Sequence, residues 1–338
     1  MRKLFRVAIA FAMSGPAAAQ MSATFKGETI TINIGYPAGG APDLYFRVLA
    51  RHYGRHMPGN PTIVPKNMPG AGTLRAANYI YNVAAKDGTE LANFSSSATV
   101  EPLMDNDQAR FDATKFSWIG SMNQEINFCG IWQRPGAPTS FVDMLTKETV
   151  FASSGGLTSF GYQHPLIFKN ILGANVRMVS GYPGMTQAFV ALQRGEANGL
   201  CGLVRTHIKT LWPKDVEEGR FKLIVQLGPK TTNELGDHVA NIFDFAKTEE
   251  DTKVFEFHFN TKLLGRPLAG PPGVPKERLA ILRQAFQNTM RDPEFLAEAQ
   301  KANLDIDPAT HEQVEQLLAQ FAAYPNAVIE KAKLAITR

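Results

Sequence analysis

The sequence is poor in cysteine and has no long apolar run. Only two of its 338 residues are cysteine, and they lie in the middle of the chain. Two cysteines cannot supply the four nitrogen or sulfur ligands of a structural zinc site, so we expect no metal. No apolar stretch approaches the ~20 residues that a membrane-spanning helix needs. We therefore expect a soluble protein.

The sequence also lacks a basic excess. The formal net charge is +4, and three of the basic residues, Arg2, Lys3 and Arg6, lie at the extreme N-terminus. If that segment is removed, 4 minus 3 leaves a net charge of +1. Proteins that bind nucleic acids normally carry clustered lysine and arginine, and no such cluster is visible here. We expect no nucleic-acid partner.

The first 19 residues have the pattern of a secretory signal peptide. The three basic residues precede a short apolar segment, residues 7–13, and small alanines occupy positions 17–19. We expect cleavage after Ala19 and export of the remaining chain. In an oxidising compartment Cys129 and Cys201 either form a disulfide or remain two buried thiols, and the sequence leaves both possibilities open.

Residues 28–53 read as a strand, a glycine turn and a helix. Ile30, Ile32 and Ile34 alternate with polar residues, which is the period of a strand with one buried face. Prolines and glycines fill positions 36–42, and Asp43 is expected either to cap the following helix or to contact a ligand. Such a unit directs unpaired backbone N–H groups outward and favours anion binding.

The same order of strand, loop and helix repeats along the chain. It recurs from about residue 61 and starts again at about residue 149, which indicates two α/β units with parallel strands. The last 60 residues are helical and have no strand to pair with, so they are expected to pack back on the first unit. The predicted division is residues 24–125 with 250–338 for lobe 1, and residues 126–249 for lobe 2.

Several short motifs resemble one family of exported receptors. The segment Ile-Gly-Tyr-Pro-Ala-Gly-Gly at residues 34–40, together with Asp43 and Arg47, is similar to the opening motif of the solute-binding receptors of tripartite tricarboxylate transporters, also called Bug receptors. Residues 67–72, 152–155 and 181–184 resemble further motifs of this family in the same order. The likeness covers nearly all of the chain after residue 29.

The resemblance implies a two-lobed periplasmic binding protein of the type II-like class, with a hinge between the lobes. It further implies a monomer without cofactor or enzymatic activity that captures a small carboxylate and delivers it to a membrane permease. Aromatic acids, dicarboxylates, citrate-like tricarboxylates and acidic amino acids are all compatible with this reading. Leu157, Pro183 and Asn198 depart from the family pattern, and Tyr36 replaces a phenylalanine that is common in the family.

One loop from each lobe is expected to face the ligand. Backbone N–H groups and hydroxyl groups of these loops would bind a carboxylate, and two tyrosines would pack against the body of the ligand. The predicted ligand-binding residues are Tyr36, Ala38, Gly39, Gly40, Ala41, Asp43, Ser95, Ser153, Ser154, Gly155, Thr158 and Tyr182.

Two other functions remain open at this stage. A receptor of the same fold that reports its ligand state to a membrane sensor kinase has no distinguishing sequence feature. A serine hydrolase would use Ser153 or Ser154 as its nucleophile, but the Gly-x-Ser-x-Gly motif of many hydrolases does not surround either residue.

Overall fold

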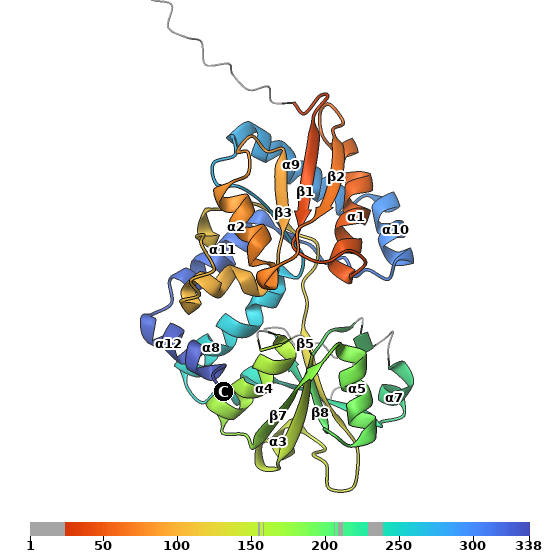
Figure 1. The fold of residues 1–338 in the computed structure, drawn as a ribbon, viewed down its shortest axis with the longest axis vertical. Helices are drawn as coiled ribbons and strands as arrows, with labels where there is room; N and C mark the ends of the chain where they lie inside the picture. The colour runs from red at the N-terminus through yellow and green to blue at the C-terminus, as the bar shows by residue number, and fades with distance from the viewer. Residues whose placement is uncertain (1–23, 155, 158, 206, 209–211, 229–238) are drawn as a thin grey trace, which may run out of the picture.

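The protein folds into two lobes, each built on one six-stranded sheet flanked by helices. The computed structural model describes residues 24–154, 156–157, 159–205, 207–208, 212–228 and 239–338. The lobes lie one above the other in Figure 1 and are joined by a narrow connection. The predicted two-lobed α/β fold is confirmed. The predicted signal peptide lies outside the described residues.

The sheet of lobe 1 has the strand order β12-β4-β11-β3-β1-β2. Its strands are β1 (Thr29–Ile34), β2 (Thr62–Asn67), β3 (Glu90–Asn93), β4 (Ser117–Ser121), β11 (Pro267–Gly270) and β12 (Ala309–Thr310). Strand β1 pairs in parallel with β2 and β3, as the alternation of elements predicts. Strand β11 lies antiparallel between β3 and β4, because the chain enters it on its way back from lobe 2.

Helices cover both faces of this sheet. The helical elements of the lobe are α1 (Ala41–Tyr53), α2 (Leu74–Asn82), η3 (Ser96–Met104), α9 (Lys276–Thr289), α10 (Pro293–Lys301) and α11 (His311–Ala322). Ile30, Ile32 and Ile34 of β1 are fully buried and belong to the same apolar cluster as Phe46 of α1 and Phe286 of α9. The early helix α1 thus lies beside the late helix α10, as Figure 1 shows.

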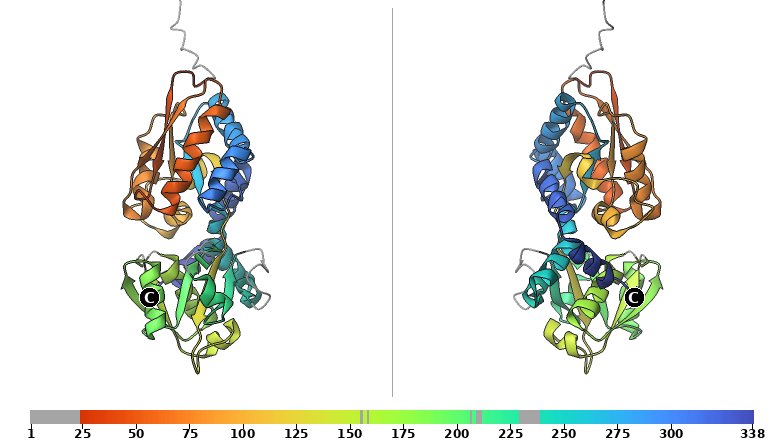
Figure 2. Two further views of the ribbon diagram at one scale, coloured as in Figure 1. Left: turned by 90° about the vertical axis from the view of Figure 1, so that its right-hand side faces the viewer. Right: turned by 90° about the vertical axis from the view of Figure 1, so that its left-hand side faces the viewer.

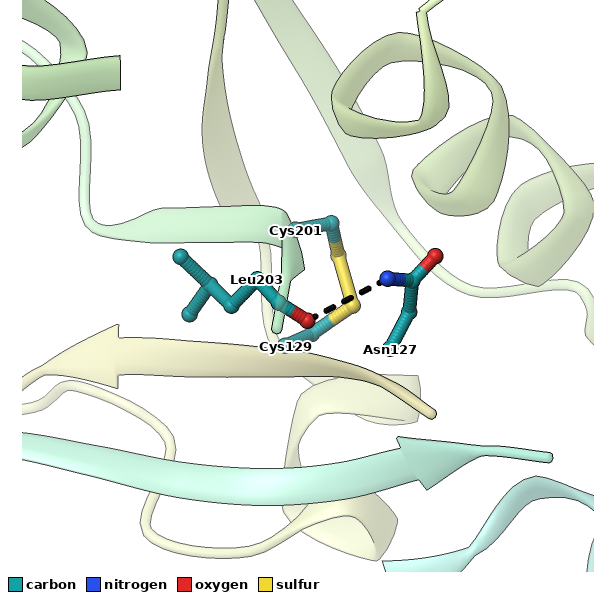
Figure 3. The surroundings of a disulfide bond; sticks show 4 residues. All are labelled: Asn127, Cys129, Cys201 and Leu203. Atoms are coloured by element: carbon teal, nitrogen blue, oxygen red, sulfur yellow. Dashed lines mark hydrogen bonds between the residues drawn. A yellow bond between two sulfur atoms is a disulfide. The ribbon is translucent and has the colours of Figure 1, made fainter. Parts of the chain in front are cut away.

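The sheet of lobe 2 has the strand order β10-β9-β5-β8-β6-β7. Its strands are β5 (Asn127–Trp132), β6 (Thr149–Ser154), β7 (Val176–Tyr182), β8 (Gly199–Leu203), β9 (Phe221–Leu227) and β10 (Ala240–Asn241). Its helices are α3 (Phe141–Thr146), α4 (Phe160–Leu172), α5 (Met185–Arg194) and α7 (Pro213–Glu217). Figure 3 shows a disulfide between Cys129 of β5 and Cys201 of β8, two neighbouring strands, with a Cα–Cα distance of 4.1 Å.

Two crossing segments, residues 122–126 and 260–266, form the hinge. Three backbone hydrogen bonds join them: Glu125 N to Lys262 O at 2.9 Å, Gly265 N to Asn123 O at 3.0 Å, and Met122 N to Arg266 O at 3.1 Å. The second segment includes the 3-10 helix η6 (Asn260–Leu264), which follows α8 (Glu249–Phe259). The two lobes therefore meet along a short hydrogen-bonded ladder.

The last helix, α12 (Asn326–Ala335), leaves lobe 1 and packs on α8 and on α4 of lobe 2. Asn170 of α4 donates hydrogen bonds to Leu334 O at 3.1 Å and to Thr337 O at 2.8 Å. In Figure 2 this dark blue helix lies against the lower lobe. Among the described residues no helix is both long enough and apolar enough to cross a membrane.

Candidate functional site

A cavity of about 640 Å³ lies between the two lobes beside the hinge. The loops that follow β1, β2 and β3 form its lobe 1 side, which is the edge where the carboxyl ends of these parallel strands meet. Ligands of open α/β sheets bind at this edge. Lobe 2 contributes Ser159 and Phe160 at the start of α4, and the hinge contributes Lys262 and Arg266.

The loop after β1 reaches the cavity through Tyr36. The preceding residue, Gly35, donates its N–H to Asn93 O at 2.8 Å. A Cβ atom on Gly35 would lie 3.0 Å from both Asn93 O and Thr73 Cβ, so the close packing of these loops requires glycine. Burial raises the pKa of the Tyr36 hydroxyl, and the positive charge of Arg266 opposes this shift.

The next residues of this loop, Ala38 to Ala41, are exposed and do not line the cavity. Helix α1 begins at Ala41 with Gly40 as its N-cap and without a side-chain cap. The expectation that Asp43 caps this helix is therefore wrong, because the helix starts two residues earlier. The Asp43 carboxylate instead accepts hydrogen bonds from Gly39 N and Arg47 Nε, each at 2.9 Å.

Asp43 therefore holds the loop in place from a buried position. Burial alone would raise the pKa of its carboxyl group, but the bonds from Arg47, Gly39 and Asn67 outweigh burial and lower the pKa to about 2. The N–H of Gly39 is used within the loop. Of the lobe 1 residues predicted to bind the ligand, Tyr36 and Ser95 line the cavity.

The loop after β2 has an unusual backbone where it borders the cavity. Gly70, Ala71, Gly72 and Thr73 all have positive φ, with values of 142°, 47°, 60° and 82°. Positive φ is rare for alanine and costly for a β-branched residue, and such strain concentrates at functional sites. Thr73 Oγ1 accepts a hydrogen bond from Ser95 N at 2.9 Å and so joins this loop to the loop after β3. The sequence motif at residues 67–72 does not by itself predict these torsion angles.

In lobe 2 the predicted residues lie mostly behind the cavity wall. Ser153 is buried, with its Oγ 3.3 Å from Ser159 Oγ, while Ser154 ends strand β6 in a half-buried position. The hydroxyl of Tyr182 donates to Glu196 Oε2 at 3.0 Å, and neither residue lines the cavity. Gly155 and Thr158 lie outside the described residues and remain predictions.

The strongest electrostatic feature of the site is a group of three charges at the hinge. Glu125 Oε1 lies 3.0 Å from Arg266 Nη2, and Glu125 Oε2 lies 3.5 Å from Lys262 Nζ. Burial alone would raise the pKa of Glu125, but the two cations outweigh it and lower the pKa. Burial lowers the pKa of Lys262, and Glu125 opposes this shift.

Sequence reasoning missed all three of these residues. Lys262 and Arg266 are four positions apart in a short stretch with no motif, and such charges usually mark a solvated surface. Their position at the crossing between two lobes follows from tertiary structure.

No protein-family model matches the chain. A curated relative from Cupriavidus necator, described as a UPF0065 protein in the gbd 5′ region, is 25% identical, and the match covers 95% of this chain and 92% of the relative.

Three solved structures share the fold. A TctC solute-binding protein from Polaromonas has 18% identity, coverage of 91% of this chain and 100% of that chain, and a TM-score of 0.69. The periplasmic binding protein BugD has 17% identity, coverage of 90% and 97%, and a TM-score of 0.57. MatC from Rhodopseudomonas palustris, solved with bound malate, has 16% identity, coverage of 91% and 99%, and a TM-score of 0.58. These structures share the two-lobed fold that the resemblance to the tripartite tricarboxylate receptor family implies.

Three of the four departures from the Bug receptor pattern, Leu157, Pro183 and Asn198, lie outside the cavity lining. Leu157 has 63% of its surface exposed, and Pro183 is also exposed. Asn198 accepts a hydrogen bond from Val150 N at 2.7 Å and thereby holds β6 beside the turn that precedes β8. These three departures therefore leave the described cavity wall unchanged, whereas the fourth, Tyr36, lies in that wall.

Proposed function

We propose that this chain is a periplasmic solute-binding receptor. It captures a small carboxylate between its lobes and delivers the ligand to a membrane permease of the tripartite tricarboxylate type. The observation that carries this proposal is the cavity beside the hinge, which is lined by Lys262 and Arg266, two cations that lie beside the Glu125 carboxylate. The malate found in the related MatC structure supports a carboxylate as the ligand class.

A binding role also fits the surroundings of the candidate nucleophile better than catalysis does. The hydroxyl of Ser153 contacts Ser159 Oγ and Ser154 O. Within the described part of the chain, no histidine or carboxylate is among its hydrogen-bond partners. A serine nucleophile needs an adjacent general base. We therefore propose that the protein is not an enzyme.

The proposed location is the periplasm, reached through cleavage of residues 1–19 as a signal peptide. We propose a monomer, with lobe 1 made of residues 24–125 and 250–338 and lobe 2 of residues 126–249. This division is supported by the strands, since every strand of each sheet falls within the proposed limits of its own lobe.

The ligand is proposed to contact Tyr36 and Ser95 of lobe 1 first. Residues predicted at the lobe 2 side, Ser153, Ser154, Gly155 and Thr158, would approach it when the hinge closes. Asp43 supports the loop from behind. A ligand bonded to both lobes stabilises the closed state relative to the open state, and a permease can recognise that difference.

The test is a thermal-shift screen of the refolded, ligand-free protein against small carboxylates. A ligand present at about 100 times its Kd stabilises the fold by about 2.7 kcal/mol, which produces a clear shift in Tm. A carboxylate that raises Tm, with no consumption of the compound by NMR, supports the proposal. Turnover of a carboxylate or ester that is abolished by Ser153→Ala would contradict it.

Transport requires its own experiment. Deletion of the gene is expected to abolish uptake of the radiolabelled ligand by cells, and a plasmid copy is expected to restore it. Normal uptake together with loss of a transcriptional response to the ligand would contradict delivery to a permease and favour a sensor partner.

A further inference from the structure

Thr73 lies where the loops after β1, β2 and β3 meet beside the cavity. It belongs to the loop after β2 and is only 6% exposed. Its Oγ1 atom accepts the hydrogen bond from Ser95 N, in the loop after β3, at 2.9 Å. In the loop after β1, a Cβ atom added to Gly35 would lie 3.0 Å from Thr73 Cβ. One side chain therefore packs against the two loops that bring Tyr36 and Ser95 to the cavity.

The backbone of Thr73 has torsion angles that are unfavourable for threonine. Its φ is 82° and its ψ is −5°, in the left-handed region. The other described non-glycine residues with positive φ are Asn60, Ala71, Asp105 and Asn303, so Thr73 is the only β-branched residue among them. A β-branched side chain is crowded in this region, and such torsion angles persist only where the surrounding contacts fix them. The contacts of Thr73 with its neighbours therefore outweigh the torsional cost.

Thr73 also gives up a helix cap. It is the N-cap residue of α2, yet its side chain makes no hydrogen bond to that helix. A threonine in this position normally has an extended backbone and accepts a hydrogen bond from the second or third N–H of the helix. The hydroxyl oxygen of Thr73 binds Ser95 N instead. A local helix cap is thus replaced by a bond between two loops that line the cavity.

The bond to Thr73 fixes the start of η3. Ser95 is the N-cap residue of η3, and its Oγ accepts a hydrogen bond from Ser97 N at 3.3 Å. The hydroxyl oxygens of Ser95 and Ser97 lie 2.7 Å apart, and both residues line the cavity. Because Thr73 holds the backbone N–H of Ser95, a shift of Thr73 would displace both hydroxyl groups.

We infer that Thr73 is a positioning residue, which holds the Ser95 and Ser97 hydroxyl groups in the arrangement that binds the ligand. This inference rests on the proposed function. Three substitutions separate the role of the hydroxyl group from that of the torsion angle. Thr73→Ser keeps the hydroxyl acceptor, and Thr73→Val keeps the shape of the side chain but removes the acceptor. Thr73→Gly removes the side chain and adopts positive φ without steric cost.

Affinity and stability are measured on the same variants. Titration calorimetry of the ligand-free protein uses benzoate, succinate, citrate and glutamate, and the acid that the wild-type protein binds most tightly is then used throughout. Thr73→Val and Thr73→Gly should each bind this acid about tenfold more weakly, because the Ser95 N–H loses its acceptor. Thr73→Ser should stay within about twofold of the wild-type affinity, because it keeps the acceptor.

Urea unfolding distinguishes a positioning role from a merely structural one. Thr73→Gly should be at least as stable as Thr73→Val, because glycine removes the torsional cost, although both variants lose affinity. A loss of affinity that follows the loss of stability from one variant to the next would show that Thr73 only supports the fold, and would overturn the inference.

Hydrogen exchange tests the bond itself in the absence of ligand. The Ser95 amide should exchange slowly in the wild-type and Thr73→Ser proteins, and about tenfold faster in Thr73→Val and Thr73→Gly. Equal exchange rates in all four proteins would overturn the inference.

The matched control is Thr289→Val. Thr289 is fully buried in α9, its Oγ1 donates to Ala285 O at 2.8 Å, and it does not line the cavity. The affinity of this variant should equal that of the wild-type protein. Wild-type affinity in folded Thr73→Val and Thr73→Gly would overturn the inference and leave the receptor function intact, and Thr73→Gly decides the point if Thr73→Val does not fold. Binding of none of the four acids by the wild-type protein would reject both this inference and the proposed function.

Discussion

Lys262 Nζ lies 3.7 Å from the centre of the Phe160 ring, and this contact joins the hinge to the first residue of helix α4. The ring also packs at 5.3 Å from the ring of His164, one turn further along the helix. Phe160 is therefore placed between the charged hinge and the interior of lobe 2. A change in the position of Lys262 would therefore alter a direct contact with lobe 2.

The first prediction concerns this cation–π pair. Phe160→Leu should lower the free energy of unfolding by about 0.5–2 kcal/mol, since a desolvated ammonium over an aromatic ring contributes on this scale. Urea unfolding of Phe160→Leu, Lys262→Met and the double variant would give the coupling energy. If the effects of the two substitutions on the free energy of unfolding are strictly additive, the contact contributes nothing to stability. Phe160→Tyr keeps an aromatic ring and should be as stable as the wild-type protein.

The second prediction concerns acid stability. The pKa of Asp43 is about 2 in the folded state against an ordinary value of 3.8, so the charged group stabilises the fold above about pH 4. This contribution, about 2 kcal/mol, is lost as the pH falls from 4 through 2. Asp43→Asn should therefore be less stable than the wild-type protein at pH 7 and nearly equal to it at pH 2.

Chemical unfolding at a series of pH values would measure that convergence. Asp107→Asn is a suitable control because Asp107 is exposed, and its unfolding curve should follow that of the wild-type protein throughout. A constant difference between wild-type and Asp43→Asn proteins across the pH range would contradict the assignment of the carboxylate as the stabilising group.

The third prediction concerns the disulfide of lobe 2. Cys129 and Cys201 are fully buried and separated by 72 positions in the sequence. Loss of a native disulfide typically costs about 2–5 kcal/mol. The Cys129→Ala/Cys201→Ala variant should melt at a lower temperature than the oxidised wild-type protein and should not respond to reductant. A wild-type Tm that is the same after complete reduction in denaturant would argue against a stabilising bond.

The fourth prediction concerns the hinge ladder. A Cβ atom on Gly265 would lie 2.3 Å from Asn123 Oδ1 and 3.0 Å from Asn123 O. Gly265→Ala should therefore push the two crossing segments apart, with a cost of about 1–3 kcal/mol and weaker ligand binding. Asn123→Ala removes the Oδ1 atom, so Gly265→Ala should cost less in that background. If Gly265→Ala lowers the free energy of unfolding equally in both backgrounds, the short distance between the added Cβ atom and Asn123 Oδ1 is not the source of the strain.

Much of the fold follows from local patterns in the sequence. The alternation of Ile30, Ile32 and Ile34 predicts a half-buried strand, and β1 has that burial pattern. The helical tail from residue 275 is likewise predictable from its periodicity. The two-residue strands β10 and β12 are not, because so short a pairing is defined by the neighbouring strand.

The candidate site is less predictable for a related reason. Loops rich in glycine and serine can be recognised in the sequence by their turn residues. The positions of Tyr36 and Ser95 in such loops predict that they lie near the ligand. Lys262 and Arg266 become part of the cavity only because the chain crosses back between the lobes at that point. Sequence reasoning also could not foresee that Asp43 would occupy the Gly39 N–H, which depends on where α1 begins.

Strand β11 lies between β3 and β4, although it is made much later in the chain. When the chain is synthesised from its N-terminus, this position determines which of the two lobes can complete its sheet first. All strands of the lobe 2 sheet lie between residues 127 and 241, so that sheet can be completed while the last hundred residues are still missing. Lobe 1 begins first but must wait for residues 267–310 before its middle strand and its last edge strand are in place. Until then β3 and β4 present unpaired edges, which are aggregation-prone in partly folded chains. The N-terminal lobe is thus the one that finishes last.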